Sequence, residues 1–569
     1  MAKEMIHFMK KLLPVPEIEE NNLKGVREDE LLGECKVSSK KELEDTVNRM
    51  KMYNEAYRFD NYEPQLSKDE LTLSDKMNDS RMAINAVIKN DVDARKYPPA
   101  NPFYAVKQYI DDQSKLISGD YINLKDTFEK MPKGGNLHIH SSATYNMEKF
   151  LDDLDNAFPG EIFALENDYN TTSGSYLRGT LFRFNKATLK KSIPSVFVPL
   201  TSILGSAEAK RKLVQLYTLA DNSDYYIDHI GYIWGGFNDI FSRVGMILNI
   251  REVFKLYYTE AFKLLIKDNL DYCELRCGIA DTLYDDHNFV VNGEAFPKPN
   301  MNEDDPEFIK ILKDSYVEAA STAGEDGFQL KLILTANRGK EKIPSAIKKM
   351  ELTKKWMDNK DINKNPLLLK GIADTDSSFI IGYDLVSEED VGSTTKEFVD
   401  ALYDAGKEAL LNEVPMYLHD GESNRFDDDN LYTAYLVGTE RIGHGLNLYR
   451  YKYLQDMVKQ NQNTLEVCPI SNQVLRYIAD IRIHPIYGYL NSGLNCVICS
   501  DDPQIFCNDG LTYDFWEAYT GSDMDLRAVK KLIKNSYIYS GMSEAEKNIM
   551  LANWEKKWDS FIKDFLFTR

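Results

Sequence analysis

The chain has 569 residues, of which 43% are apolar and 28% are charged, values that are ordinary for a folded globular protein. Its 69 basic and 90 acidic residues give a formal net charge of −21, so its surface repels the phosphates of nucleic acids and anionic lipids. We therefore expect a neutral or cationic small-molecule partner, and neither a nucleic acid nor a membrane. No run of about 18 apolar residues predicts a transmembrane helix.

Cysteine usage and the first residues bear on the cellular compartment. Most of the seven cysteines lie in apolar, strand-like runs, a setting typical of buried free thiols. Residues 1–20 lack the apolar segment and small-residue cleavage site of a signal peptide. These features predict a cytoplasmic protein, with secretion as the less favoured alternative.

The chain changes character near residue 131. Residues 1–130 are polar and helix-patterned, and we interpret them as a helical N-terminal extension, interrupted at Pro98–Pro102, that caps or pairs the main domain. In residues 131–569, short apolar runs alternate with longer amphipathic segments, a pattern typical of β/α units around a parallel sheet.

Eight of the short runs are predicted strands: Asn136–His140, Asp271–Arg276, Gln329–Thr335, Phe379–Asp384, Val414–His419, Arg441–His444, Thr464–Val467 and Asn495–Ser500. Predicted helices between them include Arg251–Lys267, Pro306–Ala323, Thr394–Leu411 and Tyr451–Lys459. Eight strands with helical crossovers predict an α/β fold of the closed (β/α)8, TIM-barrel type. The interval 141–270 must then hold an insertion after the first strand.

The ends of the predicted strands carry an unusual set of polar residues. Barrel enzymes place their catalytic groups at the carboxyl ends of strands. Here those ends hold His138, His140, Asp384, His419, His444, Asp501 and Asp502, which include four of the eight histidines. A single strand-end histidine is more often structural than a ligand, but this concentration in one layer of a barrel indicates a functional site.

Four of these side chains are suited to a metal ion. His138 and His140 are two residues apart on a strand, so both imidazoles project to the same face and can bind one cation. His419 adds a third nitrogen and Asp501 adds a carboxylate. Nitrogen ligands with one oxygen, and an open position for water, are typical of catalytic zinc, although iron and cobalt accept similar ligands. Zinc lowers the pKa of a bound water to about 7.

Two further residues are candidates for acid–base chemistry. Glu422 follows His419 in a turn from which a carboxyl can face a substrate without touching the metal; the alternative is a solvated surface glutamate. His444 lies between two glycines, which let a substrate or another backbone segment approach closely. It is a candidate base beside the metal-bound water.

Five motifs, in this order, resemble those of the adenosine deaminase family: MPKGGNLHIH at 131–140, HDGE at 419–422, RIGHG at 441–445, EVCPISN at 466–472 and SDDP at 500–503. The resemblance extends from Met131 to about Phe506. The N-terminal extension, Trp234 with Phe237 and Phe241, and GYDLV at 382–386 are most similar to the adenosine deaminase growth factor branch. In that branch the N-terminal helices mediate dimerisation.

The resemblance implies zinc-dependent hydrolytic deamination of adenosine or 2′-deoxyadenosine to inosine or 2′-deoxyinosine, with release of ammonia. One zinc ion per chain would be held by His138, His140, His419 and Asp501. Glu422 would protonate purine N1, and His444 would orient and deprotonate the zinc-bound water. Asp502 would hydrogen-bond N7. A homodimer through the N-terminal helices is also implied.

Three departures from the family pattern concern the substrate and the compartment. Ser141 and Ser142 stand where many relatives have an aspartate that anchors the ribose, and a hydroxyl binds a sugar more weakly than a carboxylate does. Ser387 stands where relatives have a glycine whose backbone amide meets purine N3. The interval 141–270 has no cysteine, so the disulfide of secreted relatives is missing.

These departures leave two alternatives open. One is deamination of AMP or another aminopurine; Lys133 and Arg441 are the candidate cations for a phosphate. The other is a growth-factor-like binding protein that has lost catalysis. The presence of Glu422, His444 and Asp501 argues against the second alternative.

Overall fold

The computed structural model describes residues 66–569 apart from 91–101, 173, 192, 220–232, 281, 298–300, 324–326, 340–341, 426–428 and 568–569, together with residues 41, 45, 47 and 48. The chain divides into two compact units, residues 1–60 and 61–569, and every element named below belongs to the second. Of the predicted break at Pro98–Pro102, all but Pro102 lies outside the described residues.

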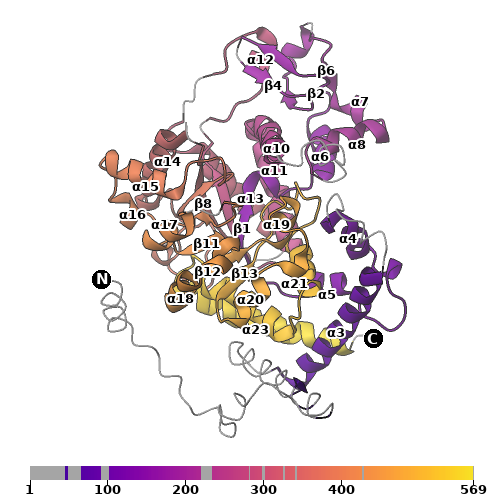
Figure 1. Ribbon diagram of the computed structural model, residues 1–569. Coiled ribbons are helices and arrows are strands. Elements are labelled where there is room, and N and C mark those ends of the chain that lie inside the picture. The colour runs from indigo at the N-terminus through magenta and orange to yellow at the C-terminus, as the bar shows by residue number, and fades with distance from the viewer. Residues whose placement is uncertain are drawn as a thin grey trace. The chain divides into compact units, whose positions relative to one another are not determined.

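Parallel strands form the centre of the second unit (Figure 1). They pair as two four-stranded sheets, in the orders β1-β7-β8-β9 and β10-β11-β12-β13. Parallel backbone bridges link the edges of these sheets, from Tyr383 to Met416 and from Ile139 to Asp501. The strands are β1 (Gly135–His140), β7 (Tyr272–Gly278), β8 (Gln329–Asn337), β9 (Ile380–Val386), β10 (His419–Asp420), β11 (Arg441–His444), β12 (Thr464–Val467) and β13 (Asn495–Ile498). The predicted α/β class with eight parallel strands is confirmed.

Helices lie between the strands and after the last one. Those between strands, from the end of the first interval onward, are α11 (Arg251–Lys267), α12 (Asn288–Asn292), α13 (Glu307–Ala323), α14 (Ile343–Asp358), α15 (Thr395–Asp404), α16 (Leu410–Glu413), α17 (Asn430–Leu436), α18 (Lys452–Gln460), α19 (Pro469–Val474) and α20 (Ile486–Asn491). Those after β13 are α21 (Leu511–Thr520), α22 (Leu526–Ile538) and α23 (Glu544–Phe567). In α18, the buried residues Leu454 and Val458 are four apart and therefore share one face of the helix. The last connection returns to the first strand, since α22 packs against both β13 and β1.

Two of the predicted elements are wrong in extent. The segment predicted as the strand Val414–His419 is a strand only from His419; before it, single backbone hydrogen bonds, such as that from Tyr417 N–H to the carbonyl oxygen of Tyr383, and the bridge at Met416 replace a continuous ladder. The predicted helix Thr394–Leu411 is two helices, α15 and α16. Gly406 adopts a left-handed φ of 64° between them, which ends the first.

The interval between β1 and β7 contains its own small sheet. Antiparallel strands β5 (Leu181–Arg183), β2 (Ile162–Leu165) and β6 (Phe197–Pro199) form it, and β3 (Tyr169–Thr171) pairs with β4 (Gly174–Tyr176). The remaining helices of the interval are α6 (Met147–Ala157), α7 (Leu200–Leu204), α8 (Ala207–Gln215) and α10 (Ile233–Leu248). Buried phenylalanines, among them Phe182 and Phe197, fill the core of this region. Helix α10 packs against β5 and carries aromatic side chains of the site described below.

The helices before the first barrel strand pack on the C-terminal helices. They are α3 (Lys68–Asn90), α4 (Pro102–Asp111) and α5 (Leu124–Lys130). Helix α3 contacts α22 and α23, where Trp558 Nε1 donates to Glu70 Oε1 over 2.7 Å. Helix α5 contacts α21. Within the described part of the chain, no helix has the length and apolar character needed to cross a membrane.

Candidate active site

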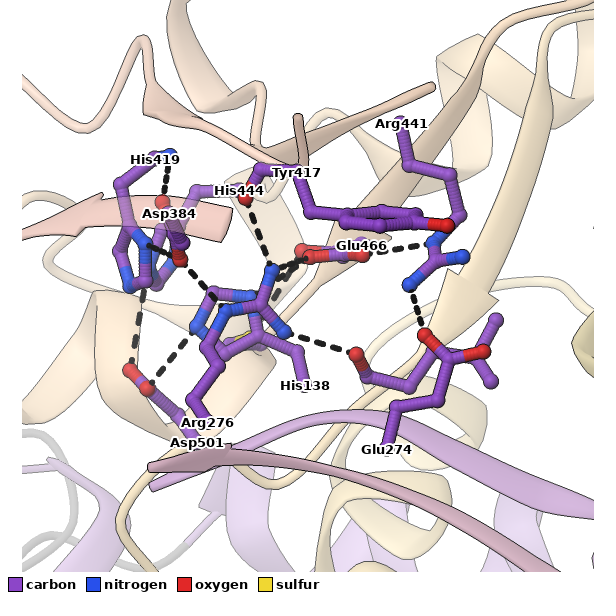
Figure 2. Close-up of polar contacts among 12 residues, drawn as sticks. His138, Glu274, Arg276, Asp384, Tyr417, His419, Arg441, His444, Glu466 and Asp501 are labelled. Atoms are coloured by element: carbon purple, nitrogen blue, oxygen red, sulfur yellow. Dashed lines mark hydrogen bonds and ion pairs between the residues drawn. The ribbon is translucent and has the colours of Figure 1, made fainter. Parts of the chain in front are cut away.

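The carboxyl ends of the strands bring the four predicted metal ligands into one buried cluster. Ligand atoms of His138, His140, His419 and Asp501 all lie within 4.8 Å of one another. His140 Nε2 is 3.2 Å from His419 Nε2 and 3.2 Å from Asp501 Oδ1. Figure 2 shows His138, His419 and Asp501 turned toward one another. His140 and His419, which are 279 positions apart in the sequence, thus meet because both β1 and β10 end at this layer.

The hydrogen bonds around the cluster fit a cation. His138 Nδ1 lies 2.8 Å from Glu466 Oε2, and His419 Nδ1 lies 2.6 Å from Asp384 Oδ2. Because carboxylates accept, each Nδ1 carries the hydrogen and each Nε2 presents a lone pair to the cluster. His138 Nε2 and Asp501 Oδ1 are buried and have no hydrogen-bond partner among the described residues. Lone pairs that converge on a buried carboxylate form the donor set of a divalent metal ion.

A buried charge network lies beside these ligands (Figure 2). Arg276 donates to Asp384 over 2.7 Å and also to Glu466, and Arg441 donates to Glu466 over 2.7 Å and also to Glu274. Burial alone would raise the pKa of Glu466, but Arg276 and Arg441 hold it well below its usual range. Glu466 therefore stays ionised, which keeps the hydrogen of His138 on Nδ1.

The ligand layer opens into a pocket of about 240 Å³. Trp234, Phe237 and Phe241 of α10 form an apolar part of the lining, and most of the predicted site residues form part of the rest. The lining includes His140, Ser141, Ser142, Asn238, Ser387, His419, Glu422, His444, Asp501 and Asp502. The predicted metal ligands His140, His419 and Asp501 thus line the same cavity as the predicted substrate residues, whereas His138 lies deeper.

The neighbourhood of Glu422 favours its protonated form. Burial raises the pKa of this carboxyl well above its usual range, and the negative charges of Asp501 and Glu389 raise it further. His444 Nδ1 lies 3.3 Å from Glu422 Oε1, and burial lowers the pKa of His444 well below its usual range. Both pKa shifts favour the neutral form of a side chain that lines this cavity, an arrangement that suits general acid–base chemistry.

Backbone strain concentrates at this pocket. His444, Asp501 and Ser387 have left-handed φ angles of 61°, 56° and 92°, although none is glycine. Such conformations cost on the order of 1–3 kcal/mol each and gather at functional sites. Ser387 thus lines the pocket in a backbone conformation that glycine would adopt freely.

Asp502 is the remaining predicted substrate residue. It lies in the pocket lining beside Asp501, and its Oδ1 is buried without a hydrogen-bond partner in the described chain. Burial and the charge of Asp501 raise its pKa well above the usual range. A buried carboxyl with an unused oxygen costs free energy unless a ligand completes its hydrogen bonds.

The two candidate phosphate-binding cations lie outside the pocket. Lys133 Nζ donates to the carbonyl oxygen of Phe128 over 2.8 Å and lies 3.4 Å from Asp268. Arg441 is buried among Glu274 and Glu466. Neither residue lines the cavity.

Three residues of the site had no role in the sequence prediction. Glu389 accepts hydrogen bonds from the backbone N–H groups of Gly421 and Glu422, over 3.0 and 2.8 Å, and so fixes the turn that carries Glu422. Asn472 donates to Glu422 Oε1 over 2.7 Å, and His484 contacts Asn472. The position of Glu389 just after β9 and the place of Asn472 in a recognised motif were available signals. His484 precedes a short helix and offers no such signal.

Comparisons with known proteins find similar chains. A family model described as Adenosine deaminase matches residues 231–557, which include His419, Glu422, His444, Asp501 and Asp502. Adenosine deaminase 2 of Dictyostelium discoideum is 29% identical over 472 residues, covering 82% of this chain and 78% of that protein. Adenosine deaminase of Lutzomyia longipalpis is 31% identical over 466 residues, covering 78% and 81%. Adenosine deaminase 2 of Homo sapiens is 26% identical over 486 residues, covering 82% and 84%.

Among solved structures, the ADAL–IMP complex superposes with a TM-score of 0.50 at 14% identity, covering 77% of this chain and 99% of that one. A likeness at this level of identity supports the fold alone.

Proposed function

The chain belongs to the adenosine deaminase family and is an aminohydrolase, and from this premise we propose that it converts adenosine and 2′-deoxyadenosine to inosine and 2′-deoxyinosine with one zinc ion per chain. The observation that carries the proposal is the meeting of Glu422, His444 and a buried set of metal-binding donors at one cavity of about 240 Å³, with burial raising the pKa of Glu422 and lowering that of His444. His138, His140, His419 and Asp501 would hold the ion, which when bound supplies a Lewis acid that acidifies water.

Glu422 and His444 would divide the proton transfers between them. As the water oxygen bonds to C6, Glu422 gives its proton to N1 and His444 takes a proton from the water. The C6–N bond then breaks, the amine takes the proton of His444 and leaves as ammonia, and the hydroxyl proton returns to Glu422. Both side chains end in their starting forms, as catalysis requires. Asp502, with its unused buried oxygen, would hold the imidazole half of the purine through N7.

The lining favours a nucleoside over a nucleotide. Of its described residues, the only one with a permanent positive charge is Arg276, whose guanidinium is already bound to Asp384, Glu466 and the carbonyl oxygens of Leu137 and Tyr417. A phosphate in this pocket would therefore lose its hydration without gaining a free cation as partner, which costs free energy. Hydroxyl and amide groups of Ser141, Ser142 and Asn238 are better matched to a sugar.

One assay tests this function against its alternatives. The purified chain is incubated with adenosine, 2′-deoxyadenosine, AMP or adenine, with and without prior removal of metal, and ammonia release is followed. We expect turnover of both nucleosides, lost on metal removal and restored by Zn²⁺. Turnover of AMP alone would contradict the nucleoside assignment. Absence of turnover with every aminopurine would favour a binding protein instead.

A further inference from the structure

A series of buried hydrogen bonds runs from the start of α20, through His484 and Asn472, to the catalytic pocket. The backbone N–H of Ile486 donates to His484 Nδ1 over 3.1 Å. His484 Nε2 lies 3.1 Å from Asn472 Oδ1, and Asn472 Nδ2 lies 2.7 Å from Glu422 Oε1. The same amide nitrogen is 3.3 Å from His444 Nδ1. This line therefore ends between the two residues proposed to move protons.

Each hydrogen bond in the line has only one workable direction. A backbone N–H can only donate, so His484 Nδ1 is an acceptor and the ring hydrogen is on Nε2. Burial lowers the pKa of His484 to about 3, so the imidazole is neutral and has that single hydrogen. It donates to Asn472 Oδ1, which fixes the orientation of the amide. The amide nitrogen of Asn472 must then face Glu422.

The orientation of Asn472 decides which oxygen of Glu422 bears the proton. An amide nitrogen donates and cannot accept, so Glu422 Oε1 is an acceptor and the acidic hydrogen is placed on Oε2. We propose that Asn472, oriented by His484, is a positioning residue that directs the proton of Glu422 to Oε2, the oxygen that Asn472 does not contact, and holds Glu422 beside His444. This inference rests on the proposed function, because it takes Glu422 as the proton donor.

The proposal predicts that these substitutions change kcat much more than KM. The proton passes to N1 as the reaction proceeds, so loss of the orienting amide should weaken the transition state more than substrate binding. Asn472→Asp keeps the shape of the side chain and removes its N–H donor. Asn472→Ala removes the whole amide. We expect kcat to fall by about 10- to 100-fold in both, with KM within about threefold, since general acid catalysis contributes about 100-fold or more in total.

His484 variants extend the test to the start of the line. His484→Phe should lower kcat by about tenfold, and His484→Gln, which retains an N–H near the position of Nε2, should recover most of that loss. His287→Gln and Asn365→Ala are matched controls, because both residues are buried and neither lines the pocket. Their kcat should stay within about twofold of the wild type.

The experiment measures kcat, KM, bound metal and Tm for all six variants, with whichever aminopurine the wild-type chain turns over fastest. A fall in kcat at constant KM and metal content, with rescue in His484→Gln, supports the proposal. It is overturned if Asn472→Asp retains wild-type kcat, or if kcat falls only in proportion to lost metal or Tm, as in a structural defect. A wild-type chain that does not deaminate adenosine contradicts the proposed function separately.

Discussion

Replacement of Glu422 by glutamine is the sharpest perturbation of the acid–base site. Glutamine has nearly the same shape, and its Oε1 can still accept the hydrogen bond from Asn472 that the carboxyl accepts over 2.7 Å. Its amide nitrogen can donate a hydrogen bond to purine N1 but cannot release a proton. Substrate and metal should therefore bind normally while the chemical step loses its acid.

The size of the loss follows from that role. A positioned general acid contributes about 100- to 10,000-fold, so kcat of Glu422→Gln should fall by that factor, a rise of about 3–5 kcal/mol in the barrier. Steady-state ammonia release gives kcat, and metal analysis checks the ion content. Glu388→Gln is a matched control, because Glu388 lies in the loop after β9 and outside the pocket lining. A Glu422→Gln variant with kcat within about tenfold of the wild type would refute the assignment of the acid.

Three further predictions concern metal, strain and pH. Removal of metal should lower Tm by several degrees, with recovery on addition of Zn²⁺, because the buried lone pairs of His138 and Asp501 lose their partner; an unchanged Tm in scanning calorimetry contradicts the metal centre. Ser387→Gly should raise Tm by about 1–2 °C and leave kcat within about twofold, since it relieves a φ of 92°; a lower Tm would mean that the serine side chain stabilises the wall. Burial raises the pKa of Glu517 to about 8, so the wild type should lose stability as pH rises from about 4.5 to 8. Denaturant unfolding should show Glu517→Gln more stable at pH 8 by a few kcal/mol, and equal pH dependence of both proteins would contradict this.

Much of the site could be predicted because the alternation of side chains along a strand depends only on neighbouring residues in the sequence. The two-residue spacing of His138 and His140 places both imidazoles on one face, and the carboxyl ends of parallel strands meet in one layer. His419, His444 and Asp501 followed from the same rule, and the structure brings all of them together. The sequence pattern therefore predicted both the fold class and the residues of the metal layer.

The residues that the sequence did not predict act through tertiary contacts, which leave no helix or strand periodicity in the sequence. Glu389 fixes Glu422 through backbone N–H groups 32 and 33 positions away. His484 reaches Asn472 from a short loop before α20, where its neighbours carry no strand or helix pattern. The strand predicted over Val414–His419 is shorter in the structure, because apolar composition does not show where the pairing of neighbouring strands becomes continuous. Supporting contacts of this kind depend on tertiary packing and become visible only in the folded chain.

The central claim is that one metal ion, Glu422 and His444 act together on a purine nucleoside. The most direct measurement follows adenosine through the reaction with the metal-loaded chain and identifies both products. The account predicts equal amounts of inosine and ammonia, formed in proportion to the fraction of chains that carry one metal ion. Undiminished product from a chain stripped of metal, or no inosine from a fully loaded chain, would contradict it.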